Sequence, residues 1–278
     1  MFKILRKKIG LIGYGNMGSA IAEGIKAKYP VFVFDKDKEK TGKPCGVEAV
    51  DNIVSLVEKS EVLILAVKPQ DFDGVLNEIK GCIKDKLVIS IAAGITTGYI
   101  ERVLGNARVV RVMPNLPAKV KEGISCLCKG RFASEEDLIF SQELFEKVGR
   151  TLVIDENMMD KATGVSGSGP GLLCDLVEGK TPEEIKDFAK NTFVPSLTTT
   201  ASSLGFSVEQ AEVLASITSA GTIKLIEVLR LSPEEVKKQV TSKKGTTEAG
   251  LAELKHNINN LDAAVKAAIQ RAKELSKE

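Results

Sequence analysis

The feature that most constrains this chain is a glycine-rich segment near its start, Gly13-Tyr14-Gly15-Asn16-Met17-Gly18. It follows an apolar run, Lys8 to Ile12, and it precedes apolar residues at helical spacing between Met17 and Ile25. A second apolar run, Val31 to Asp35, comes next. This order predicts a strand, a tight turn, a helix and a second strand, the unit in which a helix N-terminus binds the pyrophosphate of a dinucleotide.

Each glycine of this segment has an expected task. Gly13 permits the tight turn, Gly15 lets a pyrophosphate approach the backbone, and Gly18 allows the helix to pack closely. The alternative is a glycine turn that serves packing alone, which would not need three glycines at these offsets. We therefore expect a dinucleotide site here.

Asp35 closes the second predicted strand, where a carboxylate binds the ribose hydroxyls of NADH and repels the 2′-phosphate of NADPH. Lys36 and Lys38 follow it, and a lysine in this place can neutralise that phosphate. A solvated charged turn is the plainer interpretation of Lys36 to Lys40. We expect both cofactors to work, with NADH preferred.

The rest of the chain divides into two kinds of pattern. Up to about Asn157, short apolar runs alternate with helical patterns, which is typical of a mostly parallel sheet covered by helices. Further strands are predicted at Val62 to Val67, Leu87 to Ala93 and Arg108 to Pro114, with weaker ones at Ile124 to Lys129 and Thr151 to Asp155. Beyond Asn157 the patterns are helical, with starts at Thr181, Ser207 and Ser232.

These patterns predict an α/β fold in two domains. Residues 1–157 form a Rossmann-type dinucleotide-binding domain, and residues 158–278 form an all-α domain. Pro195 should end or kink the helix that precedes it.

Composition excludes several classes of protein. The 278 residues carry 39 basic and 37 acidic side chains, a net charge of +2 without a concentrated basic surface, so nucleic acid is not an expected partner. The longest apolar runs have the length of strands and not of membrane spans. The start, Met1 to Lys8, does not resemble a cleaved signal, and we expect a cytoplasmic protein.

Cysteine and histidine usage narrows the chemistry. The cysteines lack the spacing of a metal site, so we expect reduced, mostly buried thiols and no bound metal. Enzymes that reduce a ketone often use a histidine as acid, but the only histidine, His256, lies at a predicted helix end. A protonated imine, already a strong electrophile, therefore suits this chain better. The cysteines are Cys45, Cys82, Cys126, Cys128 and Cys174.

Five segments together resemble pyrroline-5-carboxylate reductase. They occur in the family's order and span most of the chain. The resemblance implies NADPH- or NADH-dependent reduction of the cyclic imine 1-pyrroline-5-carboxylate to L-proline, the last step of proline biosynthesis. The segments are Gly10 to Gly18, L-A-V-K-P at Leu65 to Pro69, V-M-P-N-L-P at Val112 to Pro117, S-G-S-G-P at Ser166 to Pro170 and T-S-K-K-G-T-T at Thr241 to Thr247.

The resemblance also implies which residues contact the cofactor. The segment Ala66 to Pro69 would lie beside its ribose and phosphates, Ala93-Gly94 and Met113 to Asn115 would approach the nicotinamide, and Asn52 would face the adenosine. For Lys68 the alternative is a solvated lysine at a helix start. The full predicted set is Gly13, Tyr14, Gly15, Asn16, Met17, Gly18, Asp35, Lys36, Asn52, Ala66, Val67, Lys68, Pro69, Ala93, Gly94, Met113, Pro114 and Asn115.

A second site is implied near the end of the chain. In the family a loop between two helices holds the substrate carboxylate, and Ser242, Gly245, Thr246 and Thr247 occupy the matching positions. Backbone N–H groups converge on an anion at such a helix N-terminus. Thr247 is the predicted catalytic residue, which orients the imine through its ring nitrogen. The alternative is that Thr246 or Thr247 caps the helix, and both roles can hold at once.

Two departures from the family pattern bear on the substrate and on assembly. Lys243 and Lys244 replace a proline and a glycine of the substrate loop, and Gly171 to Phe193 contain an additional acidic, helix-like piece. We expect the additional piece to alter the dimer surface or the mouth of the site. The family's helical half forms its dimer interface, so a homodimer, or a larger assembly of dimers, is expected.

Two other functions stay open. One is a related oxidoreductase that acts on a six-membered imine or a hydroxy acid, for which Lys161 is the candidate lysine. The other is a non-enzymatic redox sensor that binds the dinucleotide. The threonine loop argues against a sensor, which needs no second carboxylate site.

Overall fold

The computed structural model describes residues 7–42 and 46–276 and divides into two compact units. The first comprises the chain up to Val112 together with Leu127–Val148, and the second comprises Met113–Cys126 together with Gly149–Ser276.

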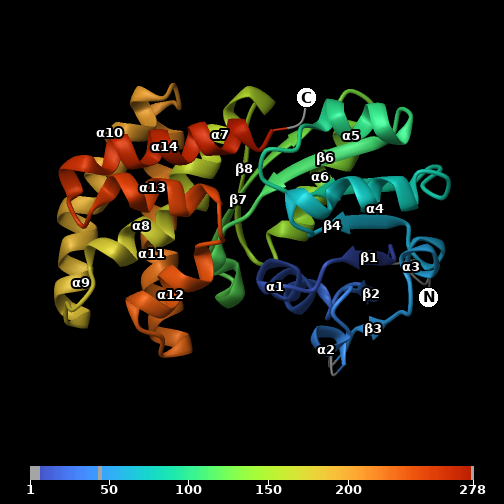
Figure 1. The fold of residues 1–278 in the computed structure, drawn as a ribbon, viewed down its shortest axis with the longest axis horizontal. Helices are drawn as coiled ribbons and strands as arrows, with labels where there is room; N and C mark the ends of the chain where they lie inside the picture. Colours follow the sequence, from blue (N-terminus) through green and yellow to red (C-terminus); the bar gives the residue numbers. More distant parts are fainter. Residues whose placement is uncertain (1–6, 43–45, 277–278) are drawn as a thin grey trace, which may run out of the picture. The chain divides into compact units, whose positions relative to one another are not determined.

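A parallel sheet forms the centre of the first unit (Figure 1). The strands of the described chain stand in the order β3-β2-β1-β4-β5-β6-β7-β8, and the pairs from β3 to β6 are parallel. Their bounds are β1 Ile9–Ile12, β2 Val31–Phe34, β3 Glu48–Ala49, β4 Val62–Leu65, β5 Leu87–Ser90, β6 Arg108–Met113, β7 Gly123–Lys129 and β8 Gly149–Val153.

The central strands of the sheet are apolar on both faces, and helices bury these faces. Every residue of β1, β4 and β5 is buried, as expected for parallel strands with helices on either side. Leu63, Leu65, Val88 and Val109 pack with apolar residues of α3, α4 and α5 in one core cluster. The helices of this unit are α1 Asn16–Ile25, α2 Lys38–Thr41, α3 Ile53–Lys59, η1 Pro69–Asp71, α4 Phe72–Ile79, α5 Thr97–Leu104 and α6 Glu135–Phe145.

Each predicted strand is present, with both ends within three residues of the prediction. Strand β3 was missed because its two residues, Glu48 and Ala49, are exposed and carry no apolar pattern. The charged turn after β2 contains a short helix, α2, whose N-terminus is capped by Asp37.

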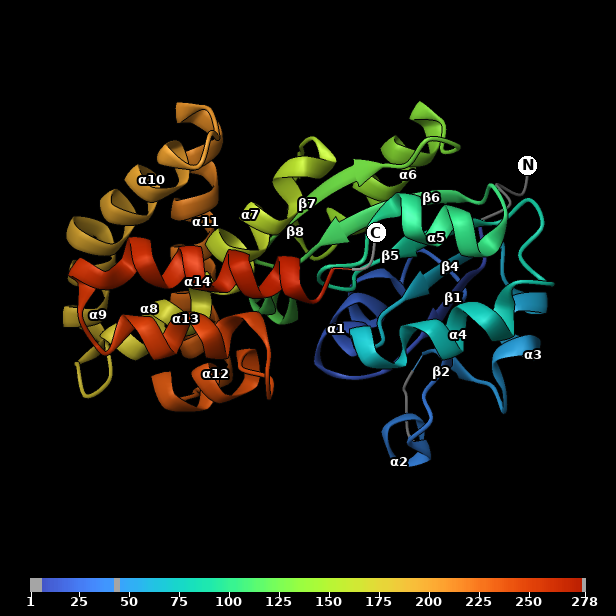
Figure 2. The ribbon, with the colours of Figure 1, turned by 45° about the horizontal axis from the view of Figure 1, so that its top comes forward.

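The second unit is mainly helical (Figure 2). Helices α10 and α11 pack against each other, as do α13 and α14 and also α8 and α12. Its helices are η2 Leu116–Val120, η3 Glu156–Met158, α7 Met159–Ala162, η4 Thr163–Gly167, α8 Gly169–Leu176, α9 Pro182–Phe188, η5 Ala189–Phe193, α10 Val194–Ser203, α11 Val208–Leu229, α12 Pro233–Val240, α13 Thr246–Leu254, η6 Ile258–Asn260 and α14 Leu261–Glu274.

The predicted helix starts in this unit are confirmed by their hydrogen bonds. Thr181, Ser207 and Ser232 each form a capping box, in which side chain and backbone exchange hydrogen bonds with the third residue of the helix. The predicted disturbance before Pro195 is a π-helical turn, Ala189–Phe193, after which the helix continues as α10. Because proline lacks an N–H and crowds the preceding carbonyl, the backbone widens there.

The division into units is more complex than one boundary between residues 157 and 158. Met113–Cys126 and Gly149–Ser276 form one unit, so the chain crosses between the units three times. Strand β7 begins in one unit and ends in the other, which a linear reading of patterns does not reveal.

None of the helices within residues 7–42 and 46–276 has the length and apolar character that a membrane span requires. Cys126, Cys128 and Cys174 are buried and Cys82 is half-buried, whereas Cys45 lies outside the described residues. Burial raises the pKa of the Cys126 thiol to about 12, which favours packing over reactivity.

Candidate functional site

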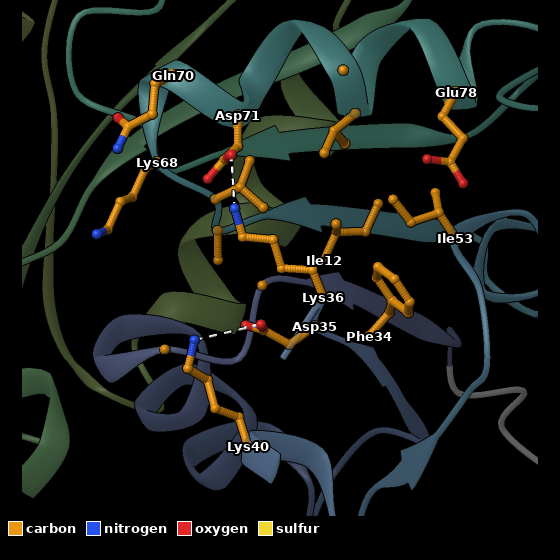
Figure 3. Close-up of a pocket in the computed structure, with 16 residues that line it drawn as sticks. Ile12, Phe34, Asp35, Lys36, Lys40, Ile53, Lys68, Gln70, Asp71 and Glu78 are labelled. Atoms are coloured by element: carbon orange, nitrogen blue, oxygen red, sulfur yellow. Dashed lines mark hydrogen bonds and ion pairs between the residues drawn. The ribbon is translucent and has the colours of Figure 1, made fainter. Parts of the chain in front are cut away.

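A pocket of about 680 Å³ opens in the first unit at the carboxyl ends of β1 and β4 (Figure 3). Strand β1 stands between β2 and β4, so the chain order reverses at this point, where open parallel sheets bind ligands. The lining residues are Ile12, Gly13, Gly15, Phe34, Asp35, Lys36, Lys40, Ile53, Ala66, Val67, Lys68, Gln70, Asp71, Gly74, Val75 and Glu78.

The three glycines after β1 differ in what surrounds them. Gly13 has φ +99°, and a Cβ there would lie 2.6 Å from the carbonyl oxygen of Ala66. A Cβ on Gly18 would lie 2.1 Å from the carbonyl oxygen of Gly13, so close packing requires both glycines. A Cβ on Gly15, in contrast, would meet nothing within 4 Å. Packing alone therefore does not explain Gly15, whereas the approach of a pyrophosphate does.

The N-terminus of α1 offers N–H groups to an anion. Gly15 is its N-cap and supplies no capping side chain, and no acidic residue stands in its first turn. Lys68, also on the pocket, has no carboxylate partner within the described part of the chain. Uncapped N–H groups and a lysine are what a pyrophosphate would bind.

Asp35 connects the end of β2 to the glycine-rich turn. Its carboxylate accepts hydrogen bonds from the backbone N–H groups of Tyr14, at 2.7 Å, and Asp37, at 2.9 Å. Burial opposes its ionisation, but these two hydrogen bonds and Lys40 outweigh burial and lower the pKa of Asp35. The ionised carboxylate on the pocket wall suits ribose hydroxyls.

Lysines next to Asp35 are themselves paired. The ammonium of Lys36 lies 2.8 Å from Oδ1 of Asp71, and that of Lys40 lies 3.5 Å from Oδ1 of Asp35 (Figure 3). The hydrogen bond to Asp71 raises the pKa of Lys36. Asp71 was not among the residues predicted from the sequence, although it closely follows the L-A-V-K-P segment.

The predicted cofactor residues divide into those that line this pocket and those that do not. Gly13, Gly15, Asp35, Lys36, Ala66, Val67 and Lys68 line it. Tyr14, Asn16, Met17, Gly18 and Pro69 are their neighbours in the chain but are not part of the lining. Ala93 and Gly94 follow β5 and are also absent from it.

Asn52 and Asn115 have structural partners. The side chain of Asn52 accepts a hydrogen bond from the N–H of Ser55, which caps α3, and Asn52 does not line the pocket. Asn115 is buried in the second unit, where its amide donates to the carbonyl of Ser166 and accepts from the N–H of Ile124. Met113 and Pro114 belong to the same unit as Asn115.

The predicted substrate loop lies in the second unit between α12 and α13. Its four predicted residues come together at the start of α13, where Gly245 is the N-cap and its N–H donates to the carbonyl of Ser242 at 2.8 Å. A Cβ on Gly245 would lie 2.2 Å from Oγ of Ser242, so only glycine fits without a shift.

A cluster of hydroxyl groups lies beside this loop. Oγ1 of Thr247 donates to Oγ of Ser168, and Ser168 in turn donates to Oγ1 of Thr246, both at 3.3 Å. Ser168 and Thr247 are buried. Ser168 follows a π-helical turn, η4, a distortion that often occurs at functional sites.

Gly171 fixes the other side of Thr247. A Cβ at Gly171 would lie 2.6 Å from the methyl group of Thr247, so the threonine packs directly against the backbone of α8. No role was predicted for Ser168, which lies in the S-G-S-G-P segment, or for Gly171, which follows it. Only folding reveals their proximity to Thr247, which lies about eighty residues further along the chain.

The alternative role, in which Thr246 or Thr247 caps α13, is wrong. The helix begins at Thr246, its N-cap is Gly245, and it has no side-chain cap. The threonine hydroxyls bond Ser168 instead. The N–H groups of the first turn therefore receive no capping oxygen from Gly245, which suits a carboxylate.

His256 lies at the C-terminal end of α13, as predicted. Its backbone N–H donates to the buried carboxylate of Asp175 at 3.2 Å, while its side chain is largely exposed. Lys237 forms an ion pair with the same carboxylate at 3.0 Å. These contacts join α8, α12 and the end of α13, so the role of His256 here is structural.

Family comparisons cover both units. The family described as "NADP oxidoreductase coenzyme F420-dependent" matches residues 8–94, and the family described as "Pyrroline-5-carboxylate reductase dimerisation" matches residues 191–278. The second match begins at residue 191, after α8 and α9.

Similar curated proteins extend over nearly the full chain. The pyrroline-5-carboxylate reductase of Methanosarcina acetivorans is 36% identical and covers 98% of this chain and 97% of its own length. The pyrroline-5-carboxylate reductase of Arabidopsis thaliana is 33% identical and covers 97% of this chain and 95% of its own length.

Solved structures agree with this similarity. The pyrroline carboxylate reductase of Plasmodium falciparum, solved with NADP bound, has a TM-score of 0.63 and 28% identity and covers 98% of each chain. The pyrroline-5-carboxylate reductase of Coxiella burnetii also has a TM-score of 0.63, with 30% identity over 98% of this chain and 99% of its own.

Proposed function

Because the chain belongs to the pyrroline-5-carboxylate reductase family, we propose that it reduces 1-pyrroline-5-carboxylate to L-proline with NADH or NADPH. The observation that carries this proposal is the hydroxyl cluster of buried Thr247, buried Ser168 and half-buried Thr246 at the start of α13, which has no side-chain cap. It combines N–H donors for a carboxylate with a hydroxyl for the ring nitrogen, the two polar groups of this substrate.

The pocket of the first unit fits a nicotinamide dinucleotide. Gly15 would admit the pyrophosphate to the start of α1, Lys68 would neutralise it, and Asp35 would accept hydrogen bonds from a ribose. The remaining residues of the predicted cofactor set, from Tyr14 to Asn115, are part of this proposal. When bound, the reduced nicotinamide supplies the hydride that adds to the imine carbon.

The side chains of the second unit would orient the imine. The N–H groups at the start of α13, with Ser242 and Gly245, would hold its carboxylate. Thr247 donates its own hydrogen to Ser168, so its lone pairs can accept a hydrogen bond from the N–H of the protonated imine. Neutralising the iminium with hydride needs no acid from the protein at that moment, and catalysis rests on proximity and orientation.

The proposal includes assembly and location. We infer a homodimer formed through the helical region, which is supported by the exposed apolar residues Val208, Val228 and Leu229 on α11. We propose a larger assembly of such dimers, a cytoplasmic location, and a functional division into residues 1–157 for the cofactor and 158–278 for substrate and dimerisation.

The test is the oxidation of NADH and NADPH, followed at the nicotinamide absorbance, with pyrroline-5-carboxylate and separately with piperideine-2-carboxylate. We expect turnover of the five-membered imine. Turnover of the six-membered imine alone would reassign the substrate, and cofactor binding without turnover of either imine would contradict the reductase proposal.

A further inference from the structure

One ion pair of the cofactor pocket joins two segments that are distant in the sequence. Lys36 follows β2, Asp71 ends η1, and both line the pocket. Their side chains meet at 2.8 Å across the space between these segments (Figure 3).

The pair determines which charges are available next to Asp35. Lys40 contacts the carboxylates of Asp35, at 3.5 Å, and Asp37, at 3.6 Å. With Lys36 bound to Asp71, both lysines on this side of the pocket are paired. A 2′-phosphate on the adenosine ribose would therefore meet the ionised Asp35 and two pocket-lining lysines, Lys36 and Lys40, that are already paired with carboxylates.

We propose that Asp71 is a specificity-determining residue, which holds Lys36 away from the 2′-phosphate position and so favours NADH over NADPH. The inference rests on the proposed use of nicotinamide dinucleotides. It adds that the preference is set jointly by Asp35 and by a carboxylate on the opposite wall of the pocket.

The exposure of the pair allows this preference to be changed. The side chain of Lys36 is 74% exposed and that of Asp71 is 37% exposed, so solvent screens their attraction. Replacing Asp71 with asparagine would release Lys36 without altering the size of the side chain. It would also remove a negative charge that repels the phosphate.

The experiment is a titration of the full-length protein with NADH and with NADPH, followed by nicotinamide fluorescence in the absence of any imine. For Asp71→Asn we expect the Kd for NADPH to fall about three- to thirtyfold, which corresponds to one or two modest charge interactions. The Kd for NADH should change by less than about twofold.

Two variants separate the bridge from a general charge effect. Glu78→Gln removes the same charge from another part of the pocket lining, and it should change the NADPH to NADH ratio by less than about twofold. In Lys36→Gln/Asp71→Asn, the gain for NADPH should be lost. An equal gain in Glu78→Gln, or a gain that persists in the double variant, would overturn the proposal.

The result is also separable from the proposed reaction. An unchanged ratio in Asp71→Asn, with tight binding of NADH, would contradict this inference and leave imine reduction intact. Failure of the unmodified protein to bind either dinucleotide would contradict the proposed function itself.

Discussion

At the scale of single residues, the hydroxyl of Thr247 is the group on which the proposed chemistry depends most. Replacing Thr247 with alanine removes the acceptor for the iminium N–H, so kcat/KM for the imine should fall about tenfold to a thousandfold, since each 1.4 kcal/mol lost from the transition state is tenfold. Steady-state kinetics with saturating cofactor measure this. An unchanged kcat/KM would contradict the assignment of Thr247 as the residue that orients the imine.

Ser168 affects the same hydroxyl indirectly. It accepts the hydrogen of Thr247, so Ser168→Ala would leave the Thr247 hydroxyl free to rotate and to donate in the wrong direction. We expect kcat to fall about three- to thirtyfold, the value of roughly one hydrogen bond, with a smaller change in KM.

The matched control for Ser168 is in the same segment. Ser166 is equally buried, but its hydroxyl donates to the carbonyl of Ala162, four residues earlier in the chain. Ser166→Ala should therefore leave kcat within about twofold of the unmodified protein. A similar loss in both variants would mean that Ser168 acts through stability alone, which thermal unfolding would reveal.

At the scale of elements, the loop before α13 carries a residue in an unfavourable conformation. Lys244 has φ +58°, the left-handed region in which glycine is favoured. Hydrogen bonds offset this cost, because the N–H of Lys244 donates to Glu248 at 2.6 Å and its carbonyl accepts from Arg271 at 2.9 Å.

Lys244→Gly should therefore raise the free energy of unfolding by about 0.5 kcal/mol. The substitution relieves the strain of the left-handed conformation, and part of this gain is offset because glycine increases the entropy of the unfolded chain. Lys243→Gly is the control, because φ of Lys243 is not positive and only the entropy cost remains. It should lower the free energy of unfolding by about 0.5 to 1 kcal/mol in urea denaturation. Equal effects of the two substitutions would contradict the explanation.

Elements differ in how well their sequences predict them. The buried strands and the capping boxes at Thr181, Ser207 and Ser232 depend on local patterns, and they occur where predicted. The short strand β3 and the start of α13 depend on neighbours instead: β3 is formed by pairing with β2, and the hydroxyls at α13 are bound by Ser168.

At the scale of the whole molecule, folding stabilises the ionised form of several carboxylates. The hydrogen bond from the backbone N–H of Thr181 lowers the pKa of Glu184 below its ordinary value of 4.5, and the pKa of Asp35 is lowered as well. A lowered folded pKa means stability that is present above about pH 4.5 and is lost as the pH falls through the folded pKa.

We therefore expect the free energy of unfolding to decrease as the pH falls from about 5 to about 3, measured by urea denaturation at a series of pH values. Glu184→Gln keeps an acceptor oxygen but cannot titrate, so the decrease should be shallower in this variant. A steeper decrease, or stability that rises on acidification, would show that other groups dominate.

The sequence by itself determined the type of fold and the glycine-rich turn that lines the pocket with Asp35. The alternation of apolar runs, the three glycine offsets and Asp35 are local features, and their consequences follow from backbone geometry within one strand–turn–helix–strand unit. Tertiary structure decided which residues complete the sites. Asp71 reaches Lys36, and Ser168 and Gly171 reach Thr247, only because crossovers of the sheet and packing of α8 against α13 bring distant segments together. Such contacts leave no periodic signal in the chain, since each partner alone fits a solvated charge or an ordinary helix residue.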